Sequence, residues 1–346
     1  MTTKRDGTTT DVSRTTIGVA DRRALFCCSA IALATLWVAP AATKERRSIE
    51  SLVTLDPPGS VDSRPIGIND SGDITGLYFT ADGRGHGFLL TRGVYTSIDV
   101  PGAIRTNATG VAELRPLDDS DADASGDGRP RSRGTHRRLA VVGRYDTPDG
   151  VAHGYRLSDG VLTTIDFPGT TFTVAAGINS SGHIVGRYLG ADRLFHGFTF
   201  IDGGFTTIDY PGALSIHGIT INAKGDIAGY YEDVARTFHA FLLSDDGVFT
   251  TIDPPGSLAT GSAGGTLGLN SRELVGFYRV RPSTSPCGCD GYGAFVFRKG
   301  DYEVFDLPET TSTFFAGINR RGDIVGSYRD AAQRGHGFLL PQGVDE

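Results

Sequence analysis

The chain has 346 residues, of which 39% are hydrophobic and 21% are charged, and its formal net charge is -7. This composition supports a sizeable core and excludes a disordered protein. The acidic balance argues against a nucleic-acid binder, because phosphate recognition needs a basic face. The 48 glycines indicate many turns, as an all-β fold of short strands requires.

Residues 1–42 have the pattern of a targeting segment. A basic start is followed by an apolar run from Ala24 to Ala39 and then by small residues. A run of about sixteen residues is short for a membrane span, and small residues after it suit signal-peptidase cleavage. We therefore expect a signal peptide over 1–42, with an uncleaved anchor as the alternative and 43–48 as a linker. The protein is then secreted, extracellular or periplasmic, and meets a membrane only through an uncleaved segment.

The region 49–346 repeats one unit of about 43 residues. Each unit ends in a turn of the Asp-x-Pro-Gly type, where proline fixes φ and glycine permits a positive φ. We expect the aspartate to bond back onto its own turn. The six aspartates are Asp56, Asp99, Asp166, Asp209, Asp253 and Asp306. Such a period is typical of propeller blades and of two-helix solenoids.

The clearest unit runs from Gly177 to Gly212 and contains four strand-sized pieces. Asn179 and the Ser-Gly after it predict a tight Asx-type turn, and Ile184-Val185 predicts the strand that follows. The next two segments, 196–200 and 205–209, alternate apolar and polar residues as strands do. Four strands in about 43 residues correspond to one propeller blade.

A tyrosine recurs once per unit, which together with the six turns predicts six blades. The tyrosines are Tyr78, Tyr145, Tyr188, Tyr231, Tyr278 and Tyr328. Segment 49–59 supplies a terminal strand before the first hairpin, while the last unit stops just before its own terminal strand. We therefore predict an all-β, six-bladed β-propeller whose ring is closed by pairing of the N-terminal strand with the last blade. The alternative is a linear β-solenoid, which gains nothing from such shifted ends.

The tripeptide His239-Ala240-Phe241 has variants in four other units, and Gly-Ile-Asn turns recur beside them. These motifs resemble the bacterial HAF family of extracellular repeats over most of residues 49–340. The fifth unit departs from the pattern, with Gly293 in place of the histidine. The resemblance implies an exported repeat protein whose biochemical activity is not established.

Five repeated histidines accompany the tyrosines and aspartates: His86, His153, His196, His239 and His336. A catalytic or metal site needs unlike residues in unlike roles, whereas equal residues in equal contexts satisfy buried polar groups once per blade. We therefore interpret the His, Tyr and Asp as a structural hydrogen-bond network in each blade.

The first insertion, residues 113–137, contains Asp123, Ser125 and Asp127, whose spacing matches the first oxygen ligands of a calcium loop. Gly128 sits sixth, as the sharp turn requires, but Arg131 stands where an acid is expected in the ninth position. The flanking acidic and basic runs equally fit a solvated, mobile loop. Calcium is therefore the only cofactor that the sequence suggests, and the alternative is a loop without metal.

The second insertion, residues 281–292, places Cys287 and Cys289 two residues apart. In an exported protein these thiols could form a strained local disulfide, which would close a very short loop and contribute little stability. Free thiols are the alternative. Zinc would need two further ligands that the neighbourhood does not offer.

No familiar catalytic signature is present in the sequence, which disfavours an enzyme without excluding one. A sparse site built from loops could still use His136, His183 or His217, although lone histidines are more often surface or turn residues. The leading hypothesis is a non-enzymatic scaffold that binds a protein or a carbohydrate on one face or in the channel. The alternatives are an extracellular hydrolase or lyase on the same ring, and a surface repeat that acts through copy number.

Overall fold

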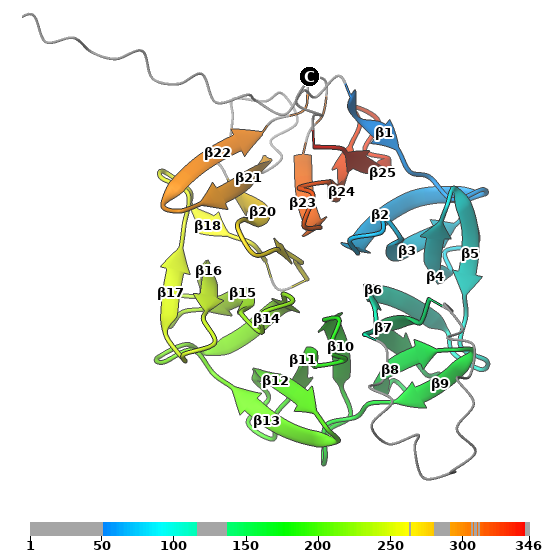
Figure 1. Cartoon of the computed structure of the whole chain (residues 1–346), viewed down its shortest axis with the longest axis horizontal. Helices are drawn as coiled ribbons and strands as arrows, with labels where there is room; N and C mark the ends of the chain where they lie inside the picture. Colours follow the sequence, from blue (N-terminus) through cyan, green and yellow to red (C-terminus); the bar gives the residue numbers. More distant parts are fainter. Residues whose placement is uncertain are drawn as a thin grey trace, which may run out of the picture. The chain divides into compact units, whose positions relative to one another are not determined.

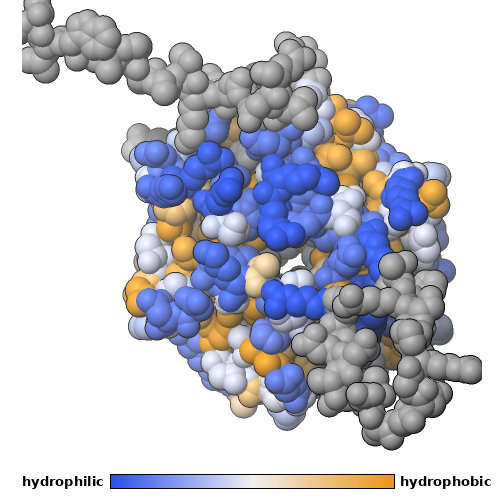
Figure 2. Space-filling view, in the orientation of Figure 1, coloured by the Kyte–Doolittle hydropathy of each residue, from blue (hydrophilic) through white to orange (hydrophobic). Residues whose placement is uncertain are grey.

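The computed structural model describes residues 51–115, 137–262, 264–279, 291–305, 307, 310 and 312–342. Within those ranges the regular elements are β-strands. They stand in groups around a common centre (Figure 1), and a space-filling view shows an opening there with hydrophilic residues along much of its rim (Figure 2). The predicted all-β propeller is confirmed over the linear solenoid.

Antiparallel strand pairing divides the described strands into six groups, which we call blades, and short parallel bridges join some neighbouring blades. Blade 1 comprises β2 (Ser60–Ile68), β3 (Ile74–Thr80), β4 (Gly85–Thr91) and β5 (Val94–Ile98). Blade 2 comprises β6 (Arg105–Glu113), β7 (Leu139–Asp146), β8 (Ala152–Ser158) and β9 (Val161–Thr164). Blade 3 comprises β10 (Thr173–Ile178), β11 (Ile184–Leu189), β12 (Phe195–Ile201) and β13 (Gly204–Ile208).

The remaining blades follow the same order, from an inner strand outward. Blade 4 comprises β14 (Ser215–Ile221), β15 (Ile227–Glu232), β16 (Phe238–Leu243) and β17 (Phe249–Ile252). Blade 5 comprises β18 (Ala259–Thr260) and β19 (Gly268–Leu269), both paired with β20 (Leu274–Arg279), and then β21 (Tyr292–Arg298) and β22 (Asp301–Phe305). Blade 6 comprises β23 (Ser312–Ile318), β24 (Ile324–Arg329), β25 (Gly335–Leu340) and β1 (Val53–Thr54).

Blade 6 combines strands from both ends of the described chain. β1 pairs antiparallel with β25, and Val53 lies opposite Leu339. The backbone N–H of Leu55 donates to the carbonyl of Gly337 over 2.8 Å. The side chain of Leu55 is buried in a cluster with Phe88 and Val325. The two segments whose pairing the sequence predicted are therefore neighbours.

Each blade contains one buried aromatic ring that packs on a glycine. The rings are at most 1% exposed and belong to Phe88, Tyr155, Phe198, Phe241, Phe295 and Phe338. The register places them opposite Gly76, Gly143, Gly186, Gly229, Gly276 and Gly326. A Cβ atom on Gly186 would lie 2.0 Å from the carbonyl oxygen of Val174 and 2.5 Å from Cζ of Phe198. The ring thus fills the space that a side chain would need.

The predicted Asx turns are confirmed in the hairpin between the first two strands of a blade. In blade 3, Oδ1 of Asn179 accepts hydrogen bonds of 3.1 Å from the backbone N–H groups of Ser181 and His183. Gly182 has φ of 82°, in the left-handed region that glycine enters without steric cost. The turn leaves the amide group of Asn179 directed toward the next blade.

These turn asparagines form a chain of hydrogen bonds from blade to blade. Each Nδ2 donates to the backbone carbonyl of the next asparagine, over 3.2 Å for Asn179 to Asn222, 3.3 Å for Asn222 to Asn270, 2.8 Å for Asn270 to Asn319, and 3.3 Å for Asn319 to Asn69. All five side chains are at most 8% exposed. Buried amides paired in this way fix the spacing between neighbouring blades.

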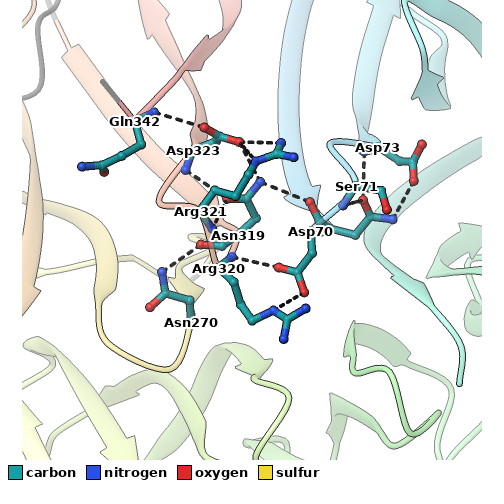
Figure 3. Close-up of polar contacts among 10 residues, drawn as sticks. Asp70, Ser71, Asp73, Asn270, Asn319, Arg320, Arg321, Asp323 and Gln342 are labelled. Atoms are coloured by element: carbon teal, nitrogen blue, oxygen red, sulfur yellow. Dashed lines mark hydrogen bonds and ion pairs between the residues drawn. The ribbon is translucent and has the colours of Figure 1, made fainter. Parts of the chain in front are cut away.

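The contact between blades 6 and 1 has extra polar links (Figure 3). The backbone N–H of Arg320 donates to Oδ1 of Asp70 over 2.8 Å, and its guanidinium forms an ion pair of 2.7 Å with the same carboxylate. Within blade 6, Asp323 accepts hydrogen bonds from Arg321 and from the backbone N–H of Gln342. Side chains around the turns therefore join the first described blade to the last.

Blade 2 interrupts the asparagine chain. Glu113 ends β6 where the other blades turn through asparagine, and the insertion follows it. Arg137 connects blades 1 and 2 in place of an asparagine. Its Nε donates to Oε2 of Glu113 over 2.8 Å, and its Nη1 donates to Oδ1 of Asp73 in blade 1 over 3.0 Å. The hydrogen bond from Arg137 is the main cause that lowers the pKa of Glu113.

Candidate functional site

The structure brings the repeated histidines and aspartates together in every blade where both are described. Nδ1 of the histidine lies 2.7–2.9 Å from the carboxylate in the pairs His86–Asp99, His153–Asp166, His196–Asp209, His239–Asp253 and His336–Asp56. The last pair joins residues 280 positions apart in the chain. In these contacts the carboxylate reaches the histidine of the neighbouring strand, so the His–Asp part of the predicted network is present.

The repeated tyrosines stack on the histidines instead of hydrogen-bonding to them. Ring centroids lie 5.0–5.3 Å apart in the pairs Tyr78–His86, Tyr145–His153, Tyr188–His196, Tyr231–His239 and Tyr328–His336. The hydroxyl of Tyr78 lies 3.2 Å from Oγ of Ser97, which itself donates to Asp99. In blade 5, where Gly293 replaces the histidine, Tyr278 packs against Phe295; Asp306 lies outside the described residues.

In blades 3, 4 and 6 the histidine also lies near a second carboxylate. Nε2 is 3.2 Å from Asp192 for His196, and 3.4 Å from Asp233 for His239 and from Asp330 for His336. For His336 the hydrogen bond to Asp56 is the largest cause and raises the pKa. For His196 partial burial lowers the pKa, but the bonds to Asp209 and Asp192 outweigh it and the net shift is upward.

These shifts predict a pH-dependent contribution to stability. A histidine with a raised pKa in the folded state stabilises fully below its unfolded pKa of about 6.5, and this contribution is lost as pH rises through the folded value. The lowered pKa of Asp330, about 2, keeps its carboxylate ionised in that acidic range. We expect the melting temperature to be about 1 to 4 °C higher at pH 5.5 than at pH 8.5.

The matched test is the double variant H196N/H336N beside H196A/H336A. Asparagine keeps a donor near the carboxylates but does not titrate, so H196N/H336N should flatten the pH profile while H196A/H336A also lowers stability. A pH profile in H196N/H336N as steep as that of the parent would remove these histidines as its source.

The predicted calcium ligands, the two cysteines and one of the lone histidines lie outside the described ranges. These are the calcium candidates Asp123, Ser125 and Asp127, the cysteines Cys287 and Cys289, and His136. In the described ranges, no group of three or more His, Cys, Asp or Glu side chains could hold a metal ion. In the same ranges the structure contains no helix long and apolar enough to cross a membrane.

A cavity of about 470 Å³ occupies the centre of the ring, and residues of all six blades line it. Five of the lining side chains are arginines: Arg64 on β2, Arg105 on β6, Arg144 on β7, Arg187 on β11 and Arg329 on β24. We call these five the arginine cluster. They lie on blades 6, 1, 2 and 3, while blades 4 and 5 contribute small residues such as Gly218 and Gly264 and the ring of Phe277.

Carboxylates hold part of the arginine cluster in place. Asp146 accepts a hydrogen bond of 2.8 Å from Nε of Arg105 and forms an ion pair of 3.0 Å with Arg144. Asp62 accepts 2.8 Å and 3.0 Å hydrogen bonds from Arg64 and lies 3.9 Å from Arg329. Two carboxylates thus orient four guanidinium groups toward one region.

Arg144 and Arg187 approach the same aromatic ring. The guanidinium carbon lies 5.2 Å from the centroid of Phe172 for Arg144 and 6.0 Å for Arg187, and Arg187 also lies 4.9 Å from Phe195. Burial is the main cause that lowers the pKa of both arginines, and the charge of Arg144 lowers that of Arg187 further, to about 10. Both remain charged at neutral pH.

His217 corrects a sequence prediction. This residue on β14 is only 3% exposed, whereas a surface or turn position was expected. Nη1 of Arg187 lies 3.0 Å from Nδ1 of His217, and because arginine only donates, Nδ1 must accept and the ring is neutral with its proton on Nε2. Nε2 lies 3.9 Å from Glu232. His183 stands just before β11, in the turn where it was expected.

The cavity wall breaks the sixfold repeat. The residue that precedes the repeated tyrosine differs between blades: Leu77, Arg144, Arg187, Tyr230, Phe277 and Ser327. Sequence reasoning did not single out these positions, although an alignment of the six units on their tyrosines would have shown charged, apolar and small residues in one column. Five of these six residues line the central cavity, whereas Tyr230 is fully buried and does not line it.

Neither a family model nor a curated protein matches the chain, so the HAF resemblance rests on the repeated motifs alone. Among solved structures the chain is similar to AofleA from Arthrobotrys oligospora, with 14% identity and a TM-score of 0.51 over 86% of this chain and 88% of that one. It is also similar to the SapL1 lectin in complex with alpha methyl fucoside, with 12% identity and a TM-score of 0.50 over 82% and 94% of the two chains.

TolB from Acinetobacter baumannii has 12% identity and a TM-score of 0.45, with 82% of this chain covered. The chain spans 54% of the length of that protein. At such identities AofleA and SapL1 show the β-propeller fold and nothing finer.

Proposed function

We propose that the protein is a non-enzymatic binding protein that takes a carbohydrate in its central cavity. The observation that carries the proposal is the cavity of about 470 Å³, whose wall combines arginines, aromatic rings and glycines from different blades. Cavities of this size with a few convergent polar groups on apolar walls suit small ligands. The SapL1 lectin, which shares the fold, was solved with a fucoside, and this supports sugars as the first ligand class to test.

The test is binding of an oligosaccharide panel to the parent protein, followed by calorimetry, with a variant that fills the cavity. Gly264 lines the cavity, and a Cβ atom added to it would have no other atom within 4 Å, so Gly264→Phe adds bulk without a clash at its base. Gly204→Phe on the outer strand of blade 3 is the control, because Gly204 is exposed. We expect only Gly264→Phe to abolish binding. Absence of sugar binding by the parent would refute the proposal.

The proposal also includes the export of the protein, the closure of its ring and the structural role of its repeated residues. In this proposal the protein is exported through residues 1–42, has a linker over 43–48 and a propeller over 49–346, and binds its ligand outside the cytoplasm, as the HAF resemblance also implies. The pairing of β1 with β25 supports closure of the ring by the two chain ends. The His–Asp contacts of the blades support a structural role for the repeated residues.

One observation favours the alternative, an extracellular hydrolase or lyase. The unlike residues at equivalent positions of the cavity wall provide the asymmetry that a catalytic site needs. Prolonged incubation with the bound oligosaccharide distinguishes the two functions. New reducing ends indicate hydrolysis, ultraviolet absorbance of an unsaturated product indicates a lyase, and unchanged sugar supports a binding protein.

A further inference from the structure

The arginine cluster gives the central cavity a local positive charge. Among the described residues, its five guanidinium groups face three carboxylates, those of Asp62 and Asp146 and, beyond His217, that of Glu232. Glu232 also forms an ion pair with Arg236 outside the cluster. The region therefore keeps a net positive charge while the whole chain has a net charge of -7. Such a local field attracts anions to this opening.

The carboxylates balance the cluster only in part. At Arg144 the attraction of Asp146 outweighs the repulsion of Arg105, whereas Arg187 is exposed to the positive charge of Arg144. The side chain of Arg144 is only 13% exposed, so water screens this repulsion poorly. Guanidinium groups offer planar pairs of donors that match the two oxygens of a carboxylate. A ligand carboxylate beside Arg144 and Arg187 would offset the repulsion.

The rest of the wall suits a sugar ring. Phe277 and Phe314 line the cavity and pack edge to face, with centroids 5.0 Å apart. Gly218 and Gly264 line the same cavity, and Gly264 leaves room at its surface, because a Cβ atom there would meet no other atom within 4 Å. The wall thus joins arginines from blades 6, 1, 2 and 3 to an apolar part formed by Phe277 of blade 5 and Phe314 of blade 6, with open space beside Gly264.

We propose that the ligand of the central cavity is an acidic carbohydrate, a uronic-acid-containing oligosaccharide whose carboxylate binds between Arg144 and Arg187. This inference rests on the proposed function. Arg105 and Asp146 position Arg144, and His217 positions Arg187 through the 3.0 Å contact between Nη1 and Nδ1. Phe172 lies against both guanidinium groups and keeps their planes in place.

The experiment compares four ligands by calorimetry on the full chain: an oligogalacturonide, the neutral galactose oligomer of the same length, alpha methyl fucoside and inorganic phosphate. We expect the acidic oligomer to bind at least about tenfold more tightly than its neutral counterpart, and this preference to shrink as salt is raised. Arg187→Gln should weaken the acidic oligomer by about 10- to 100-fold, the range of a lost charged hydrogen bond, and leave the neutral one within about twofold.

Two further variants keep the result interpretable. Arg193→Gln, an exposed arginine on the turn after β11 in the same blade, is the matched control and should change nothing. Arg187→Lys retains the charge but not the planar pair of donors, so it tests recognition if Arg187→Gln fails to fold; we expect intermediate affinity.

The outcomes separate this inference from the proposed function. Equal binding of acidic and neutral oligomers, insensitive to Arg187→Lys, would overturn the inference and leave a carbohydrate-binding protein. Phosphate binding as tightly as the acidic oligomer would also overturn it, because the site would then recognise a free anion. If none of the sugars binds, the proposed function itself fails.

Discussion

Gly186→Ala is expected to destabilise blade 3 strongly. The added Cβ would lie 2.0 Å from the carbonyl oxygen of Val174, a backbone atom that cannot move without breaking the pairing of β10 with β11. The same Cβ would meet the ring of Phe198, which is fully buried. Overpacking of this kind costs about 1 to 3 kcal/mol or more, a large part of the roughly 5 to 15 kcal/mol that stabilises a typical protein.

Gly204→Ala is the matched control for this prediction. Gly204 belongs to the same blade, has no positive φ, and its added Cβ would have ordinary contact at 3.5 Å with the carbonyl oxygen of Ile201. Urea denaturation should place Gly204→Ala within about 0.5 kcal/mol of the parent and Gly186→Ala far below it. Equal midpoints for the two variants would show that the ring does not occupy the glycine's space.

Leu55→Ala is the second substitution with a large expected effect. Leu55 follows β1, is 7% exposed and packs with Phe88 of blade 1 and Val325 of blade 6. Its backbone carbonyl accepts a 2.7 Å hydrogen bond from Oγ of Ser63, so the cavity left by truncation cannot collapse freely. Leucine-to-alanine changes in such sites cost about 2 to 5 kcal/mol.

Thermal denaturation of Leu55→Ala beside Leu162→Ala measures this contribution. Leu162 lies on the outer strand β9 and is 37% exposed, so its truncation should lower the melting temperature by far less. Hydrogen exchange adds a local readout, because the amides of β1 and β25 should lose protection only in Leu55→Ala. Similar melting temperatures for both variants would mean that the joint between the chain ends adds little stability.

The repeated parts of the fold could be predicted because the same residues recur at the same places in most of the six units. The period, the Asx turn around Asn179 and the partnership of residues 49–59 with the last unit needed only local propensity and the phase of the repeat. The bond between histidine and aspartate was part of the predicted network, whereas the stacking of the tyrosine on the histidine was not predicted, because the environment of each side chain depends on strand pairing. Asp209 meets His196 only once β12 and β13 lie side by side.

The candidate site was harder to predict, because it consists of residues that differ from one repeat unit to the next. Arg144 and Arg187 are ordinary surface-type residues in sequence, and only the ring brings them to one cavity with Arg329 from a distant unit. His217 looked like an irregular turn residue, yet an irregularity in the register of β14 lies between it and Thr220, and it is buried. These placements depend on tertiary contacts that no local pattern encodes.

The pairing of β1 with β25 also has a consequence for the order of folding. Its partners are about 280 residues apart, as are Asp56 and His336, and contacts of such high sequence separation form late because their loop entropy is lost before they stabilise anything. Interactions absent from the transition state govern the unfolding rate and leave the refolding rate almost unchanged. We therefore expect the pairing of β1 with β25 to slow the unfolding of the protein and to leave its refolding rate almost unchanged.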